Sequence, residues 1–162
     1  MKCSTCGAEA RIEKGDFDMA ELGVPNVVLR GLEILVCKSC GSRDPMVPRL
    51  ADLMRTIAAA FLAKPAKLAG TEVKFLRTRA ELTQAQFAEL LHVDRTTVTK
   101  WETGEWPLPA SSDVAIRSVI RLLDDTLRAS AEVVRGELTG IDEAKADPLH
   151  VLIDAGTLRL TA

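Results

Sequence analysis

The spacing of apolar residues changes its period near residue 48. Before that point the segment 26–36 reads NVVLRGLEILV, in which Leu32, Ile34 and Val36 alternate with other residues as in a β-strand. A shorter strand is expected over Ala10–Glu13, and Gly31 predicts a bulge or bend in the longer one. The first part of the chain is therefore expected to be rich in β-structure.

Beyond Pro48 the apolar residues recur at helical intervals. One helical face is formed by Leu50, Leu53, Met54, Ile57, Phe61 and Leu62. The pair Lys64-Pro65 ends that helix, because the residue before a proline is disfavoured in the helical conformation. We expect two further helices here, with Thr71 and Asp113 at their N-caps. The second of these carries an apolar stripe at Ile116, Val119, Ile120, Leu123 and Leu127.

The segment 82–104, LTQAQFAELLHVDRTTVTKWETG, predicts two short helices joined by a tight turn. Thr83 is the expected N-cap of the first helix and Asp94 that of the second, and Gly104 is the expected stop. Val98 and Trp101 lie on the apolar face of the second helix, so Trp101 is expected in the core. Such a pair is typical of a helix-turn-helix, whose second helix enters the major groove of DNA.

Five side chains of this segment are candidates for DNA contact. Arg and Lys can donate to guanine, and Thr offers a hydroxyl and a methyl group, so the polar face of the second helix can bind base edges. Gln84, at the start of the first helix, is placed to reach a phosphate. Trp106, in the following loop, could equally cover the core or touch the DNA backbone. The polar face of the second helix carries Arg95, Thr96, Thr99 and Lys100. Arg95 and Thr96 are expected to reach deepest into the groove, followed by Lys100.

All four cysteines lie in two Cys-x-x-Cys-Gly motifs, at Cys3, Cys6, Cys37 and Cys40. Each motif places two thiolates on the same side of a turn, and two motifs complete a four-cysteine site of the structural kind, for which Zn²⁺ is the favoured ion. Iron, a redox dithiol or disulfides are the alternatives. Disulfides are disfavoured in the cytoplasm, where we expect this protein.

The overall charge argues against strong non-specific binding to nucleic acid. The net charge is −2, and by our count residues 64–128 carry roughly +1 while residues 129–162 carry roughly −3. We therefore expect binding to depend on a homodimer and on base contacts. No apolar run reaches the length of a membrane span, so no membrane association is expected. No paired acid and base suggests catalysis, so the protein is not expected to be an enzyme.

These motifs resemble two known families. The segment 82–104 is similar to the lambda-repressor-like (Xre/Cro) helix-turn-helix family, and CSTCG…CKSCG followed by it resembles the YgiT/MqsA family of zinc-finger/helix-turn-helix proteins. That resemblance implies a zinc-binding N-terminal module, a dimeric DNA-binding domain and repression of the protein's own operon at palindromic sites. In toxin–antitoxin members the N-terminal module binds a toxin. His92 departs from the Xre pattern, which often has glycine there, and must adopt a left-handed conformation or re-form the turn.

The sequence thus predicts an α+β protein in two parts. We expect a small zinc-bound, β-rich module over 1–47, a connecting helix and linker over 48–69, an all-α helix-turn-helix domain over 70–135, and a tail of uncertain structure over 136–162, in which a hairpin or a loose end are both open. The expected function is that of a DNA-binding repressor of the antitoxin or stand-alone class. The alternative is an interaction adaptor that binds a partner through the zinc module and an exposed strand over 26–36.

Overall fold

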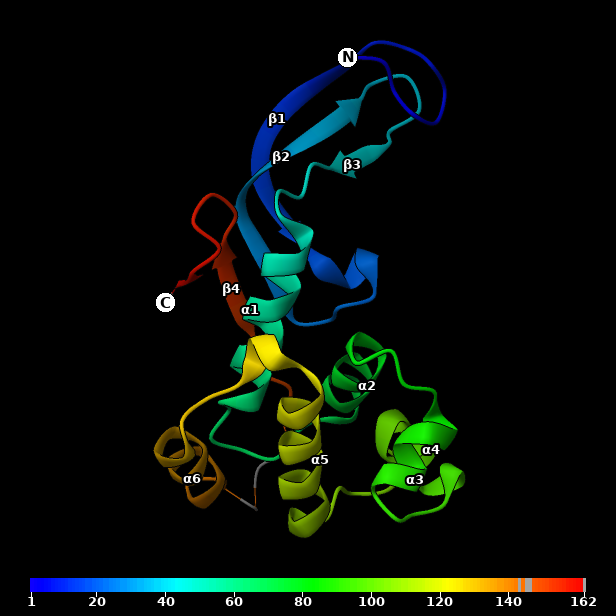
Figure 1. Cartoon of the computed structure of the whole chain (residues 1–162). Coiled ribbons are helices and arrows are strands. Elements are labelled where there is room, and N and C mark those ends of the chain that lie inside the picture. Colours follow the sequence, from blue (N-terminus) through cyan, green and yellow to red (C-terminus); the bar gives the residue numbers. More distant parts are fainter. Residues whose placement is uncertain (143, 145–146, 162) are drawn as a thin grey trace. The chain divides into compact units, whose positions relative to one another are not determined.

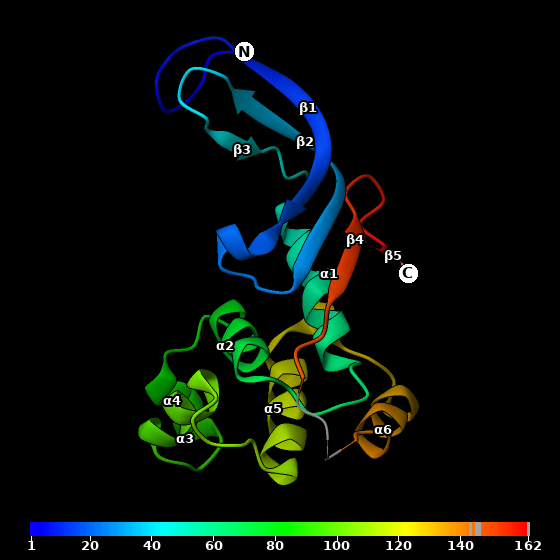
Figure 2. The same ribbon diagram turned by 180° about the vertical axis from the view of Figure 1, so that it is seen from behind.

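Strand β2 (Val27–Cys37) is central to a five-stranded sheet in the computed structural model, which describes residues 1–142, 144 and 147–161. β1 pairs with it antiparallel along one edge. On the other edge β3 pairs antiparallel with its C-terminal half and β4 pairs parallel with its N-terminal half (Figure 1 and Figure 2). β5 adds to β4. The other strands are β1 (Ala10–Asp18), β3 (Arg43–Pro45), β4 (Val151–Asp154) and β5 (Leu160–Thr161), and a 3-10 turn, η1 (Met19–Leu22), follows β1.

The bulge predicted at Gly31 is confirmed. The pairing shifts between Gly15, opposite Leu32, and Phe17, opposite Leu29, so β2 has one extra residue here. Gly31 has φ +66° and its amide donates to the Asp16 carboxylate over 3.3 Å. The bulge also shifts the side-chain alternation by one residue, because the buried positions change from odd to even numbers. It therefore keeps one apolar face of β2 in the core, formed by Val27, Leu29, Leu32 and Ile34.

The expectation of an exposed apolar strand at 26–36 is wrong. β2 has paired strands along both edges, and its apolar side chains Val27, Leu29 and Ile34 are at most 2% exposed. The strand on which the adaptor hypothesis relied is thus part of the core.

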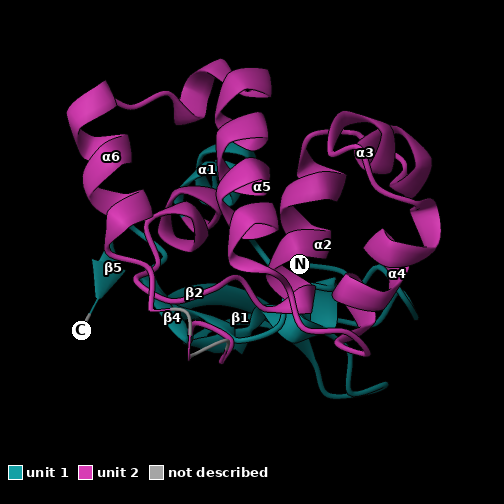
Figure 3. Ribbon diagram, turned by 90° about the horizontal axis from the view of Figure 1, so that it is seen from below, with its two compact units in different colours: residues 1–56, 150–162 teal, residues 57–149 magenta. Residues whose placement is uncertain are grey.

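The structure also decides between the two alternatives left open for the C-terminal stretch. Val151 to Asp154 align in parallel with Val27 to Arg30, and β5 folds back onto β4. Thr56 donates its hydroxyl to the Leu158 carbonyl over 3.4 Å, which ties this stretch to the first half of the helix that begins at Leu50. Residues 150–162 therefore belong to the same compact unit as the N-terminal strands (unit 1 of Figure 3). Residues 143, 145 and 146 of the predicted tail lie outside the described residues.

The chain divides into two compact units (Figure 3). Unit 1 contains residues 1–56 and 150–162, and unit 2 contains residues 57–149. The predicted α+β architecture, a β-sheet module with four clustered cysteines followed by a helical region, is confirmed. The finer domain ranges stay predictions. The helices are α1 (Leu50–Leu62), α2 (Gly70–Arg79), α3 (Gln84–Leu90), α4 (Arg95–Thr103), α5 (Ala110–Leu123), the 3-10 turn η2 (Asp125–Leu127) and α6 (Ala131–Thr139).

Two of the predicted N-caps are wrong. α2 begins at Gly70, one residue before Thr71, and the Glu72 carboxylate accepts the free amide of Ala69 over 2.8 Å. α5 begins at Ala110, after Pro109, so Asp113 lies inside its first turn. Both acidic side chains stabilise their helix from within it, and neither helix has a hydroxyl or carboxylate at the N-cap position.

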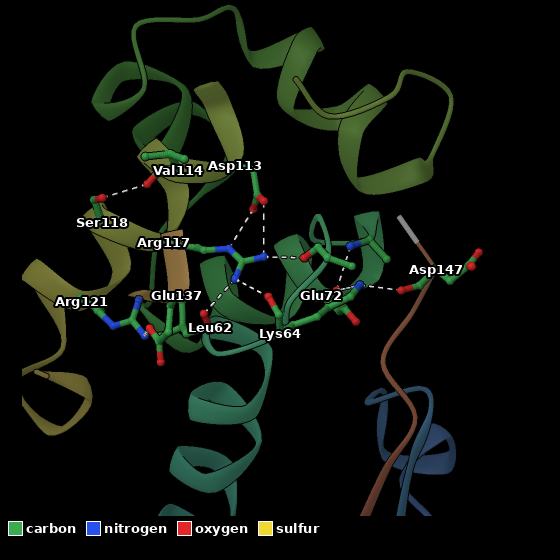
Figure 4. A network of polar contacts seen from close by, with 12 residues as sticks. Leu62, Lys64, Glu72, Asp113, Val114, Arg117, Ser118, Arg121, Glu137 and Asp147 are labelled. Atoms are coloured by element: carbon green, nitrogen blue, oxygen red, sulfur yellow. Dashed lines mark hydrogen bonds and ion pairs between the residues drawn. The ribbon is translucent and has the colours of Figure 1, made fainter. Parts of the chain in front are cut away.

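Asp113 is instead the partner of a fully buried arginine of unit 2. The Arg117 guanidinium donates to both carboxylate oxygens of Asp113, over 3.1 and 3.3 Å (Figure 4). Its remaining N–H groups donate to the carbonyls of Leu62, Lys64 and Ala66, over 2.8, 2.8 and 2.6 Å. α5 thereby supplies hydrogen bonds to the C-terminal end of α1 and to the linker after it, whose carbonyls have no helical partner.

A second buried ion pair lies in the same network (Figure 4). Lys64 Nζ is 3.0 Å from Glu72 Oε2 and also donates to the carbonyl of Asp147. Glu72 Oε1 accepts the amide of Leu149 over 2.6 Å. The linker, the start of α2 and the segment 147–149 are therefore held together by one lysine and one glutamate.

We predict that Arg117→Leu destabilises unit 2 severely. The substitution leaves the Asp113 carboxylate buried and unpaired and three carbonyls without donors, and breaking a buried pair in this way costs about 3–5 kcal/mol. Urea denaturation followed by helical circular dichroism measures the loss. Arg135→Leu, at an exposed position of α6, is the matched control and should change the free energy of unfolding by less than about 0.5 kcal/mol. Equal stabilities for the two variants would contradict the assigned role of Arg117.

Candidate metal centre and nucleic-acid interface

The four cysteines come together at the end of the β1–β2 pair. Sγ of Cys3 lies 3.6 Å from Sγ of Cys40, and Sγ of Cys6 lies 3.6 Å from Sγ of Cys37. All four sulfurs lie within 4.8 Å of one another. Four thiolates at about 2.3 Å from a tetrahedral Zn²⁺ would be separated by roughly 3.8 Å. The cysteines therefore fit a tetrahedral metal ion, as the two motifs predict.

Each Cys-x-x-Cys-Gly motif folds as a tight turn with glycine at its end. The amide of Gly7 donates to the Cys3 carbonyl over 3.0 Å, and that of Gly41 to the Cys37 carbonyl over 2.9 Å. Both glycines have positive φ, +72° and +74°, a backbone conformation that residues with a Cβ atom rarely adopt. Cys37 ends β2, so the sheet fixes one motif directly. Beside the centre, Cys3, Ala10, Leu35 and Cys37 form a small buried cluster.

The turns also favour thiolates. Hydrogen bonds from the backbone amides of Cys6 and Thr5 lower the pKa of the Cys3 thiol to about 6. The backbone amide of Cys40 likewise lowers the pKa of Cys37. For Cys40 the amide of Ser42 favours the thiolate, but the sulfur of Cys6, together with burial and the other cysteines, outweighs it and raises the pKa to about 12. A bound divalent cation would supply the positive charge that deprotonates such a thiol.

A further residue of this site, Asp44 of β3, has no signal in the sequence pattern. Its carboxylate accepts the hydroxyl of Ser4 over 2.6 Å and that of Ser42 over 2.9 Å. These two hydrogen bonds lower the pKa of Asp44. Ser4 belongs to the first Cys-x-x-Cys turn and Ser42 follows the second, so Asp44 joins the two motifs and orients them toward one another.

We predict that Cys37→Ala removes the metal and unfolds the metal module while the helical unit keeps its structure. Three thiolates cannot close a structural site, and the small cysteine cluster loses its charge-neutralising ion. Elemental analysis should give about one metal ion per chain for the wild type and close to none for the variant. Ser39→Ala, an exposed change in the same turn, should keep the metal. Unchanged metal content in Cys37→Ala would overturn the assignment of all four cysteines as ligands.

The second candidate site is the helix pair α3–α4 of unit 2. Thr83 caps α3 as predicted: its hydroxyl accepts the amide of Gln86 over 3.2 Å, and Gln86 Oε1 accepts the amide of Thr83 over 2.9 Å. Asp94 occupies the N-cap of α4, although no side-chain hydrogen bond is present there, and Gly104 ends α4 with φ +74°. His92 takes the left-handed conformation, with φ +52°, in the turn between the helices.

The core of the helix pair follows the predicted apolar positions. Phe87, Ala88, Val98 and Trp101 are all buried, so the assignment of Trp101 to the core is confirmed. Trp106 is half exposed, and Lys100 Nζ lies 3.9 Å from the centre of its ring. At the same, C-terminal end of α4, a Cβ on Gly70 would lie 2.3 Å from the Trp101 carbonyl oxygen. Only glycine allows the start of α2 to approach α4 this closely.

A buried polar network fixes the orientation of α4. Glu102 of α4 accepts hydrogen bonds from Arg77 of α2, over 2.5 and 3.1 Å, and from Gln84 of α3, over 2.8 Å. Gln84 in turn accepts the hydroxyl of Thr99 over 3.2 Å. Three helices are thus joined through Glu102, and the sequence pattern did not reveal this role.

The five predicted DNA contacts differ in their surroundings. Arg95 and Thr96 are exposed in the first turn of α4. Lys100 is partly exposed and lies 3.6 Å from the Glu105 carboxylate as well as against Trp106. Gln84 and Thr99 are hydrogen-bonded within the network around Glu102. Arg95 and Thr96 are therefore the most accessible of the five, whereas Gln84 and Thr99 also position the helices. Their contacts to DNA stay predictions.

Comparison with protein families agrees with this geometry. Residues 68–138 match the model of a helix-turn-helix domain, which indicates a DNA-binding regulator. Searches of curated proteins and of solved structures gave no match. No helix in the described part of the chain combines the length and the apolar character needed to cross a membrane. Among the described residues, the four cysteines form the one group whose side chains lie close enough together to hold a metal ion.

We predict that Glu102→Ala loosens the helix-turn-helix. The substitution leaves Arg77 buried without its carboxylate, which costs about 3–5 kcal/mol, and it also releases Gln84. Gln84→Ala, which removes one neutral partner of a charged group, should cost only about 1–2 kcal/mol. Denaturation curves for both variants, with Glu89→Ala on the exposed face of α3 as the control, test this order. A Glu102→Ala variant as stable as the control would show that the network does not hold α4.

Proposed function

We propose that this protein is a sequence-specific transcriptional repressor of the zinc-finger/helix-turn-helix type, similar to the YgiT/MqsA family. In this proposal a homodimer binds a palindromic site in double-stranded DNA and represses the protein's own operon. The protein works in the cytoplasm and carries out no catalysis. The observation that carries the proposal is the exposed pair Arg95 and Thr96 at the start of a helix that a buried ion pair, Arg77–Glu102, holds in place.

The chemistry of α4 supports base readout. An arginine can donate two hydrogen bonds to O6 and N7 of guanine, and threonine can contact a thymine methyl group. The residues at the N-terminal end of a recognition helix are those that contact base edges. Because Arg77, Gln84 and Glu102 tie α4 to α2 and α3, the helix can present Arg95 in one orientation.

The charge of the chain supports a dimer. A net charge of −2 gives little attraction to phosphate, so one helix-turn-helix would bind weakly at physiological salt. Two copies related by a two-fold axis would double the base contacts and read half-sites roughly 10 base pairs apart. The palindromic site in the proposal follows from this symmetry.

In the same proposal the metal module has a structural role, with Zn²⁺ as its ion. The closed arrangement of four cysteines leaves no ligand position for a substrate, as in structural zinc sites. By resemblance to the antitoxin members, this module would be the part that binds a toxin protein where one is encoded nearby.

We predict that Arg95→Ala weakens binding to the specific site by about 1–3 kcal/mol and relaxes the base preference at one position of each half-site. Fluorescence anisotropy with the protein's own promoter, and with a scrambled duplex of the same composition, measures both effects. Arg135→Ala on α6 removes the same charge elsewhere in unit 2 and should leave the affinity nearly unchanged.

Two outcomes would count against the proposed function. Equal affinity of the wild-type protein for promoter and scrambled DNA would exclude sequence-specific binding. An equal loss for Arg95→Ala on both duplexes would assign Arg95 to a phosphate contact, since such contacts carry no sequence information.

A further inference from the structure

A cavity of about 380 Å³ opens in unit 2, beside the C-terminal half of α5. Its walls come from α5, from the segment after η2 and from α6. The residues that line it are Ser118, Arg121, Leu122, Arg128, Ala129 and Val134. The helix-turn-helix chemistry described above uses none of these residues. The volume lies in the range of pockets that hold small organic molecules.

Arg121 is the unusual residue of this cavity. The residue is only 8% exposed, and its Nη2 donates to the carboxylate of Glu137 on α6 (Figure 4). Its Nε and Nη1 are also buried, yet neither has a hydrogen-bond acceptor among the residues that the structure describes. Buried N–H groups of a guanidinium almost always have acceptors. Because Arg121 lines the cavity, an acidic ligand bound there would supply the acceptor oxygens once the guanidinium turns its two shielded donors toward it.

The charges around the cavity indicate which ligand would fit. Arg121 and Arg128 carry two positive charges, and Glu137 neutralises the one on Arg121. Arg128 is paired with Asp125, but both side chains are at least 70% exposed, so this pair is weak and can open. One positive charge is thus available, which suits a single carboxylate better than a doubly charged phosphate group.

The remaining wall is apolar. Leu122, Ala129 and Val134 line the cavity, and Leu122 is 75% exposed, which is unusual for a leucine. The hydroxyl of Ser118 already donates to the Val114 carbonyl over 2.8 Å, so it is left with acceptor capacity only (Figure 4). A ligand that fits both walls has an acidic end and a short apolar body.

We propose that this cavity binds a small monocarboxylate with an apolar chain. The carboxylate accepts hydrogen bonds from Arg121 and is neutralised by Arg128, while the chain covers Leu122, Ala129 and Val134. The proposal does not depend on DNA binding, because it rests on the donors and the lining of the cavity alone.

Isothermal titration of the full-length, metal-loaded protein with hexanoate tests the proposal, and hexanamide is the matched neutral ligand. We expect saturable binding of one hexanoate per chain, and at least about tenfold weaker binding of the amide, because a charge-assisted hydrogen bond to a buried guanidinium is lost. Absence of saturable hexanoate binding at millimolar concentrations, or equal binding of acid and amide, would overturn the proposal.

Three variants place the ligand in this cavity. Arg121→Gln removes the charge and should abolish hexanoate binding. Ala129→Trp fills the cavity from an exposed rim position without changing Arg121, so it decides the question even where Arg121→Gln fails to fold. Arg135→Gln, on an exposed position of α6 outside the lining, should bind like the wild type. Wild-type affinity in Ala129→Trp, or in a folded Arg121→Gln, would exclude this site.

Discussion

Where a helix ends inside a protein, its last carbonyl groups need donors from elsewhere, and at the end of α1 one side chain supplies them. Arg117 serves the carbonyls of Leu62, Lys64 and Ala66 and is itself neutralised by Asp113 one turn earlier on the same helix. A guanidinium has enough N–H groups to do this in one place, whereas a lysine ammonium has only three. The linker between α1 and α2 can therefore be short, with Lys64, Leu68 and Ala69 buried. The adjacent pair of Lys64 and Glu72 extends the same arrangement to the start of α2.

This use of charge inside unit 2 changes what the composition means. Between residues 64 and 128 the basic residues slightly exceed the acidic ones, but Lys64, Arg77, Arg117 and Arg121 are buried and paired. Their charges stabilise the interior and are not available to phosphates. The surface of the helix-turn-helix is consequently close to neutral. Selectivity for DNA would then depend on where the few exposed cations lie, and hardly at all on their number.

Local patterns in the sequence predicted most elements of the fold. Apolar spacing located α1 and α5, Thr83 and Gly104 marked helix ends, and Gly31 marked the bulge, because each of these signals depends on neighbouring residues. Each Cys-x-x-Cys-Gly motif is likewise a local signal, and the two motifs together predicted the cluster of four cysteines that could hold a metal ion. The polar network of Arg77, Gln84 and Glu102 could not be predicted. Its members are far apart in the sequence, and each of these residue types is common on a solvent-exposed helix surface, so nothing marks them as buried partners.

Long-range pairing was also beyond the sequence. The wrong N-cap prediction for Asp113 shows why. An acidic residue near the start of a helix can serve as its cap or as the partner of an arginine four residues later. Here the second role applies, because Arg117 also donates to distant carbonyls and is held in place by them. The short apolar run in β4 likewise carries no mark of its partner, β2. That pairing has a consequence for synthesis. As the chain leaves the ribosome, the whole helical unit can fold before β4 exists, so the sheet that begins first is completed last. The metal-binding end does not have to wait, because β1 and β3 pair with the C-terminal half of β2 and both are made before the helices.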